Sequence, residues 1–188
     1  WRPVTGTIVR AAFGQGFKAP TLYQLFGFYG DTSLKPEEAD SFDAGVEQTL
    51  LDGKLAAGVT AFHRRARNQI AFDLLFFRYN NIARSRTKGV ESYIRLKPTK
   101  RFTLEANYTL TDAKGKQDAD FAYSRLLRRP KHSVAVSADW AVSGKAMIGG
   151  TLHLVSDSLD GFGGSARLDG YETFDLRASV ALGDRLEL

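Results

Sequence analysis

The side chains that could ligate a metal ion are scattered along the 188-residue chain. Two groups of aspartates could supply oxygen ligands for calcium: Asp112, Asp118 and Asp120, and separately Asp157 and Asp160. Neither group has the spacing of an EF-hand loop. The three histidines fall in three different segments without metal-ligand spacing, and cysteine is absent. We therefore predict no metal site and no cofactor.

Side chains for nucleophilic catalysis are present but are not arranged for it. Serine, histidine and aspartate all occur, yet no segment resembles the strand–turn–helix elbow that carries a catalytic serine. The net charge of +5 and the pI near 9.5 raise the question of nucleic-acid binding. However, apolar alternating segments separate the basic groups, and no nucleic-acid-binding module is matched. We predict neither an enzyme nor a nucleic-acid partner.

Aromatic residues in irregular segments are better candidates for ligand binding. One group lies between glycines at 27–31, a second lies in the apolar segment 68–81, and single residues follow in later segments. The candidate ligand contacts are Phe28, Tyr29, Asp31, Phe76, Phe77, Arg78, Tyr79, Tyr123, Asp157 and Phe162. An exposed apolar patch can mark a binding surface. Two alternatives stay open: the first rings could anchor strand ends at a membrane interface, and the second segment could be strands that continue beyond a bilayer.

The segments between these candidates alternate between apolar and polar residues, which is typical of β-strands. The pattern is clearest at 101–111, where one face carries Phe102, Leu104, Ala106, Tyr108 and Leu110. Segments 41–50 and 173–182 alternate in the same way. Five weaker segments, at 4–13, 55–65, 82–96, 132–140 and 145–155, raise the expected number to about eight strands. The only helix-like stretch is 35–39.

The lengths of the strands and of their connections indicate a membrane barrel. The expected strands are about ten residues or longer, which suits a tilted membrane strand better than a soluble sandwich. Long connections at 14–36, 68–81, 113–130 and 156–169 alternate with short ones at 51–54, 97–100, 143–144 and 183–184. Outer-membrane barrels keep short periplasmic turns on one rim and longer extracellular loops on the other. No run of about 18 apolar residues predicts a membrane helix.

Four runs in series carry a family resemblance. The first two are Gly14-Gln15-Gly16-Phe17-Lys18-Ala19-Pro20-Thr21 and Leu34-Lys35-Pro36-Glu37-Glu38, the latter leading to Gly45-Val46-Glu47. The third is Asn81-Ile82-Ala83-Arg84 with Lys88-Gly89-Val90-Glu91, and the fourth is Asn107-Tyr108-Thr109-Leu110-Thr111-Asp112-Ala113. In this order they resemble TonB-dependent outer-membrane receptors. The run Leu126-Leu127-Arg128-Arg129-Pro130-Lys131-His132 is similar to the vitamin B12 receptor branch.

The resemblance implies an all-β, antiparallel, up-and-down transmembrane β-barrel of which this chain is a part. About eight strands of a 22-stranded barrel would occupy residues 1–188, roughly strands 13 to 20, with the plug domain, the TonB box and the last strands absent. A barrel of that size is too wide for side chains to fill and needs a plug. The implied partners are TonB, through the missing N-terminal part, outer-membrane lipid and a small-molecule ligand. The implied location is the Gram-negative outer membrane.

A basic run lies where the chain is expected to re-enter the membrane from outside. Its candidates for contact with lipopolysaccharide phosphates are Arg125, Arg128, Arg129 and Lys131. Arginine forks suit phosphate. The alternative is a basic loop that is merely solvated.

The expected function is active uptake of a scarce, bulky nutrient by a receptor: a cobalamin-like corrinoid first, with a ferric siderophore or haem close behind. A passive porin or small structural barrel and a soluble β-sandwich binding module are the alternatives. Eight of 22 strands would leave two open edges, so an isolated fragment is expected to aggregate, to pair edge to edge or to close on itself.

Overall fold

The computed structural model describes residues 1–73, 76–116, 122–161 and 165–181. Its elements are β1 Thr7–Lys18, α1 Leu22–Phe26, β2 Glu37–Leu50, the 3-10 turn η1 Leu51–Gly53, β3 Leu55–Asp73, β4 Arg78–Thr99, β5 Phe102–Lys116, β6 Ser124–Arg125, β7 His132–Ala141, β8 Ala146–Val155, β9 Ser158–Asp160, β10 Ala166–Leu168 and β11 Tyr171–Val180. No helix in these ranges is long and apolar enough to cross a membrane.

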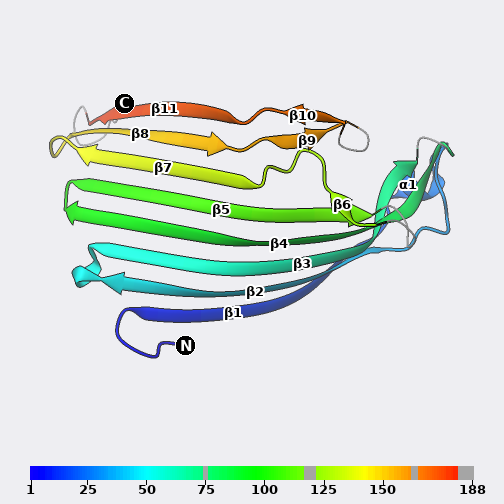
Figure 1. Cartoon of the computed structure of the whole chain (residues 1–188), viewed down its shortest axis with the longest axis horizontal. Helices are drawn as coiled ribbons and strands as arrows, with labels where there is room; N and C mark the ends of the chain where they lie inside the picture. Colours follow the sequence, from blue (N-terminus) through cyan, green and yellow to red (C-terminus); the bar gives the residue numbers. More distant parts are fainter. Residues whose placement is uncertain (74–75, 117–121, 162–164, 182–188) are drawn as a thin grey trace.

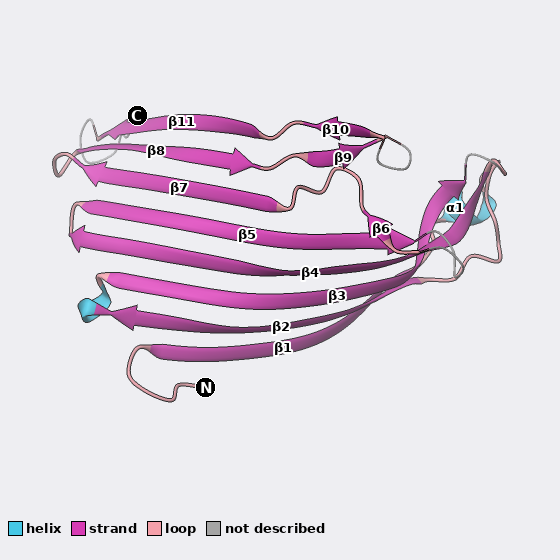
Figure 2. Ribbon diagram, viewed as in Figure 1, coloured by secondary structure: helices cyan, strands magenta, loops and turns pink. Residues whose placement is uncertain are grey.

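The long strands form a single antiparallel sheet, and consecutive strands are neighbours in it (Figure 1). Its order is β1-β2-β3-β4-β5-β7-β8-β11, with β6 paired to β5 and a separate hairpin made by β9 and β10. Figure 2 shows that helix is confined to one short segment beside the strand ends and one turn at the opposite end. The eight predicted strands and their up-and-down order are confirmed. We name the end of the sheet that carries α1, β6 and β9–β10 the loop rim, and the opposite end the turn rim.

The helix lies earlier in the chain than the sequence pattern predicts. Residues 37–39 begin β2, opposite the end of β1, with Lys18 paired to Glu37. The helix α1 instead begins after Thr21, whose backbone N–H donates to Gln24 Oε1 over 2.9 Å while the Gln24 N–H donates to Thr21 Oγ1 over 3.2 Å. This reciprocal capping box satisfies the free donors of the first turn. Pro36 also disfavours a helical conformation for the residue before it.

The predicted long loop at 68–81 is mostly strand. β3 continues to Asp73 and β4 starts at Arg78, with register shifts on either side of Gln69. Asn68 takes a φ of 56°, a left-handed conformation that asparagine tolerates better than most residues. The interpretation that the strands continue through this segment and pair there is therefore confirmed.

The register divides the sheet into an apolar face and a polar face. One row of paired residues crosses five strands on the apolar face: Ile94, Ala106, Val136, Leu152 and Phe174. The adjacent row, on the polar face, is Tyr93, Asn107, Ala135, His153 and Thr173. Successive side chains along a strand point to opposite sides, so the two rows lie back to back.

The apolar face has no protein layer over it in the described part of the chain. Phe174 is 64% exposed and Leu176 is 78% exposed. Among the described residues, the buried apolar side chains are Leu34, Ala66 and Ala113 alone. A soluble β-sandwich buries its apolar rows against a second sheet. That alternative is wrong for this chain, because its apolar rows are open.

Charged residues on the polar face pair across strands. Arg10 meets Glu47 over 2.5 Å, Arg95 meets Glu105 over 2.7 Å, and Arg177 meets Asp139 over 2.6 Å. The first two pairs join adjacent strands, whereas the third joins β7 to β11 across Gly149 of the intervening strand β8. The polar face is therefore organised as a hydrogen-bonded surface suited to water or to polar protein groups.

Two glycines on the polar face accommodate aromatic rings from the neighbouring strand. Gly89 lies directly opposite Phe62, and Gly58 lies directly opposite Tyr93. A Cβ atom on Gly89 would lie 2.5 Å from Phe62 Cζ and would also clash with the Leu110 carbonyl oxygen. Rings that lie over cross-strand glycines cover backbone that would otherwise be exposed and help to fix the register.

Replacing Gly89 by Ala is expected to destabilise the fold, because the added methyl group must displace Phe62. Overpacking of this kind costs about 1–3 kcal/mol. Gly14→Ala is the matched control, since nothing lies within 4 Å of its added Cβ. Urea unfolding of the purified protein, followed by tryptophan fluorescence, measures both variants. Equal unfolding midpoints for Gly89→Ala and Gly14→Ala would contradict the packing argument.

Candidate ligand-binding site

Five aromatic rings from two distant segments meet at the loop rim. They are Tyr23, Phe28, Tyr29, Phe72 and Tyr79, named here the aromatic cluster. Phe72 is central: its ring centroid lies 5.5 Å from Tyr29 and 5.3 Å from Tyr79. Tyr79 also meets Tyr23 at 6.1 Å, and Phe28 meets Tyr29 at 4.8 Å. All four contacts are edge-to-face, a favourable arrangement of ring quadrupoles.

Backbone and amide hydrogen bonds hold the two segments together. The Tyr79 N–H donates to the Tyr29 carbonyl over 3.0 Å. Asn81 Oδ1 accepts from the Lys35 N–H over 2.7 Å, and Asn81 Nδ2 donates to the carbonyls of Lys35 and Asn68. The β1–β2 connection is therefore fixed onto the β3–β4 hairpin rather than free above it, as Figure 1 also shows for α1.

Charged groups border the aromatic cluster. Asp31 accepts hydrogen bonds from the Ser33 N–H over 2.8 Å and from the Ser33 hydroxyl over 2.5 Å. These bonds, with a smaller contribution from the nearby Arg78 charge, hold the pKa of Asp31 below its usual value. The Arg78 guanidinium lies 5.8 Å from the Phe76 ring centroid. The site thus combines open ring faces with one fixed anion and one cation.

Several rings of this site remain open to a ligand. Phe28 is 91% exposed and Phe76 is 70% exposed, while Tyr29 is partly covered. Aromatic faces with a few polar groups beside them are typical of sites that bind a bulky organic ligand. The arrangement can stack against planar groups and attract a negatively charged complex through Arg78.

The structure brings together most of the residues singled out from the sequence. Phe28, Tyr29, Asp31, Phe76, Arg78 and Tyr79 lie in this site. Phe77 lies at the β3–β4 turn with a φ of 50° and an exposure of 61%. Tyr123 and Asp157 lie in two other connections, where they contact Arg86 and Arg167 respectively. Phe162 lies outside the described residues.

Sequence reasoning missed two members of the aromatic cluster. Tyr23 lies on α1, whose start is encoded by the T-x-x-Q capping box at 21–24, a signal that could have placed it on a helix. Phe72 lay inside the segment that was singled out, but its central position depends on where β3 and β4 pair. No local signal shows that pairing.

The basic run at 125–131 is divided between different surroundings. Arg128 pairs with Asp160 over 2.8 Å, which holds the pKa of Asp160 below its usual value and ties the run to β9. Arg129 lines a pocket on the polar face with Leu126 and Pro130. The Lys131 N–H donates to Ser156 Oγ. Arg125 lies opposite Lys114, and its Nη2 atom is buried without a hydrogen-bond partner.

The aspartates considered as calcium ligands have other neighbours. Asp112 pairs with Lys114, and Asp157 pairs with Arg167. Asp118 and Asp120 lie outside the described residues. Within the part of the chain that is described, no group of three or more metal-ligating side chains comes together.

Comparison with known proteins gives one family and a consistent fold. A family model described as "TonB dependent receptor-like, beta-barrel" matches residues 1–188. The ferric enterobactin receptor PfeA of Pseudomonas aeruginosa superposes with a TM-score of 0.79 at 16% identity, over 99% of this chain and 32% of PfeA.

Two further solved structures share the fold. The ferric-catecholate import receptor Fiu of E. coli gives a TM-score of 0.71 at 17% identity, over 100% of this chain and 28% of Fiu. The receptor FpvA of P. aeruginosa, solved with bound pyoverdines, gives a TM-score of 0.73 at 19% identity, over 100% of this chain and 26% of FpvA. The chain therefore spans about a third or less of the proteins it matches. At these identities the likeness shows the fold alone.

Proposed function

Because the chain belongs to the TonB-dependent receptor β-barrel family, we propose that the protein containing it imports a ferric siderophore across the outer membrane. The strands cross the outer membrane of a Gram-negative cell, with the apolar face toward lipid and the polar face toward the barrel lumen. The loop rim is then extracellular and the turn rim periplasmic. TonB would supply the energy through parts of the protein that precede this chain.

The observation that carries the proposal is the aromatic cluster on the extracellular rim. A ferric catecholate complex is bulky, ring-bearing and anionic, which matches open ring faces beside Arg78. PfeA and Fiu, which share this fold, are receptors for ferric enterobactin and ferric catecholates, so this ligand class is the first to test. A corrinoid is suggested by the similarity of residues 126–132 to the vitamin B12 receptor branch, whereas the receptors named above are described by ferric siderophores. A corrinoid is therefore the weaker choice of ligand.

Uptake measurements in cells test this proposal directly. The full-length receptor is produced in a strain lacking its own siderophore receptors, with and without TonB, and supplied with radioactive iron bound to each of a panel of siderophores. We expect saturable uptake of at least one ferric siderophore, only when TonB is present, and no competition from cyanocobalamin or haem.

Three outcomes would contradict the proposal. Uptake that persists without TonB would indicate a passive porin. TonB-dependent uptake of cyanocobalamin or haem, with no siderophore transported, would retain the family and overturn the ligand. Absence of any TonB-dependent transport from a correctly assembled receptor would overturn the transport function itself.

A further inference from the structure

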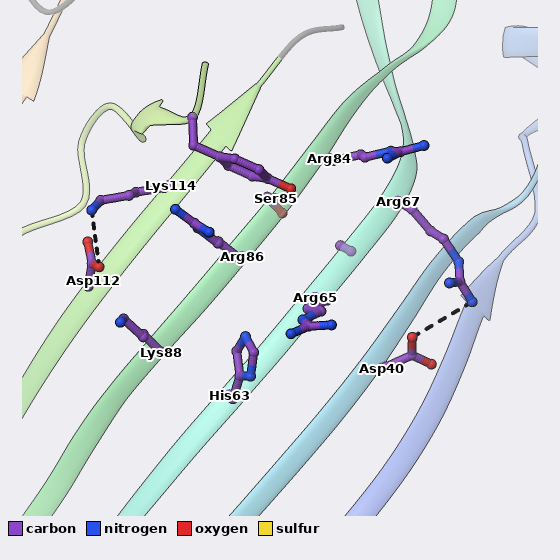
Figure 3. Close-up of a pocket in the computed structure, with 12 residues that line it drawn as sticks. Asp40, His63, Arg65, Arg67, Arg84, Ser85, Arg86, Lys88, Asp112 and Lys114 are labelled. Atoms are coloured by element: carbon purple, nitrogen blue, oxygen red, sulfur yellow. Dashed lines mark ion pairs between the residues drawn. The ribbon is translucent and has the colours of Figure 1, made fainter. Parts of the chain in front are cut away.

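A cluster of cations lies on the lipid side of the sheet, away from the aromatic cluster. Arg65 and Arg67 come from β3, Arg84, Arg86 and Lys88 from β4, and Lys114 from β5; we name these six the outer basic cluster. Together they line a surface hollow with Asp40 and Asp112 (Figure 3). In the backbone register Arg86 lies directly opposite both Arg65 and Lys114.

The register places this cluster immediately beyond the apolar rows. Val90 pairs with Ala61 on one side and with Leu110 on the other, and all three belong to the apolar face. Toward the loop rim from Val90, the next residues of β4 on the same face are Lys88, Arg86 and Arg84. With a rise of about 3.3 Å per residue, these cations lie roughly 7–20 Å from Val90 along the tilted strand. That interval overlaps the polar headgroup region outside the hydrocarbon core.

The cluster has more positive charge than its acidic neighbours neutralise. Arg67 pairs with Glu38 over 2.6 Å, and Lys114 pairs with Asp112 over 3.4 Å. Among the residues that the structure describes, no carboxylate lies within ion-pair distance of the other four members: Arg65, Arg84, Arg86 and Lys88. Like charges held side by side repel, so a bound anion would stabilise this surface.

The neighbouring side chains shape the hollow for an anion. The Arg86 guanidinium lies 4.2 Å from the centroid of the Tyr123 ring, a cation–π contact at the edge of the hollow. Arg125, opposite Lys114 on the same face, keeps one buried guanidinium nitrogen without a partner. Guanidinium groups match phosphate with paired donors, and lysine adds a point charge.

We propose that the outer basic cluster binds the phosphate groups of a lipid of the outer leaflet, the phosphorylated lipid A portion of lipopolysaccharide. The acyl chains then lie along the exposed apolar rows below it, and the phosphates meet the cations above. The proposal rests on the membrane orientation given above and is independent of the transported ligand. It places the contact mainly on β3, β4 and β5, with Arg125 the one residue of the basic run at 125–131 that lies beside it.

Lipid binding by the full-length receptor in nanodiscs tests this site. The triple variant Arg84→Gln/Arg86→Gln/Lys88→Gln is compared with Lys54→Gln/Lys97→Gln/Lys100→Gln, which removes the same charge at the turn rim. Native mass spectrometry measures lipid A retained per receptor. We expect the first variant to bind roughly tenfold or more weakly and the second to bind like the wild type.

Two further ligands distinguish lipid phosphate from free phosphate, and one further variant is expected to change binding in the opposite direction. Dephosphorylated lipid A is expected not to bind, and inorganic phosphate at the same concentration is expected not to displace lipid A. Asp112→Asn, which removes the carboxylate paired with Lys114, is expected to tighten binding. Three results would each overturn the proposal: equal binding of lipid A by the two triple variants, binding of dephosphorylated lipid A as tightly as lipid A, and displacement of lipid A by free phosphate. Unchanged siderophore uptake in the Arg84/Arg86/Lys88 variant would leave the transport function intact.

Discussion

Replacing Val136 by Arg is expected to lower the free energy of unfolding of the barrel in lipid by about 2–4 kcal/mol. Val136 lies in the middle of the apolar row, between Ala106 on β5 and Leu152 on β8. A guanidinium there would be held in hydrocarbon, far from water and from any acidic partner on that face. The expected penalty is a large fraction of the stability of most proteins.

The adjacent residue gives the control. Ala135 lies one position away on the polar face, between Asn107 and His153, so Ala135→Arg adds the same side chain toward the lumen. Both variants are refolded into lipid vesicles and unfolded with urea, and the folded fraction is read from the mobility of unheated samples in a gel. Equal losses for the two variants, or a greater loss for Ala135→Arg, would show that the faces are assigned the wrong way round.

Removing the central rings of the aromatic cluster is expected to have the largest effect on transport. In the double variant Phe72→Ala/Tyr79→Ala, three of the four ring contacts disappear, because Phe72 and Tyr79 participate in all of them except the Phe28–Tyr29 contact. Aromatic residues at the centre of a binding surface commonly contribute about 2 kcal/mol or more each. The dissociation constant for the transported siderophore should therefore rise by roughly a hundredfold or more.

Binding to intact cells and TonB-dependent uptake are measured separately for this variant. Tyr171→Ala is the matched control, because Tyr171 is also an exposed aromatic residue near the loop rim but lies at the start of β11, outside the cluster. We expect the control to bind like the wild type. If the double variant binds and transports normally while Tyr171→Ala does not, the ligand contacts lie elsewhere on the rim.

The strands were predictable because the membrane imposes a period of two on their side chains. Phe102 to Leu110 on β5 alternate without interruption, and the structure keeps that segment within one strand. The sequence pattern predicts the first strand at 4–13, too early in the chain, because Gly14 and Gly16 hide the alternation in its second half. Its true end at Lys18 is set by pairing with Glu37, which no local pattern reveals.

The candidate site was predictable as a set of residues and not as an arrangement. Exposed aromatic residues near 28 and 76 indicated two separate segments, but their contact depends on Asn81 bridging Lys35 and Asn68. Charge was harder still to interpret. Adjacent cations such as Arg128 and Arg129 are conspicuous in a sequence, whereas Arg65 and Arg86 come together only through the β3–β4 register. Alternation along a strand and proximity across strands are different kinds of information.

The length of β3 and β4 has a consequence for the thermodynamics of ligand capture. At 19 and 22 residues, both strands extend well past the apolar rows, and their hydrogen-bonded ladder includes Arg78 and Tyr79 at the start of β4. Fixing a free backbone costs about 1–2 kcal/mol per residue in conformational entropy. The β3–β4 ladder beyond the apolar rows is already formed without a ligand. An incoming ligand therefore does not lose binding energy to ordering these residues, and more of the energy of its contacts appears as affinity.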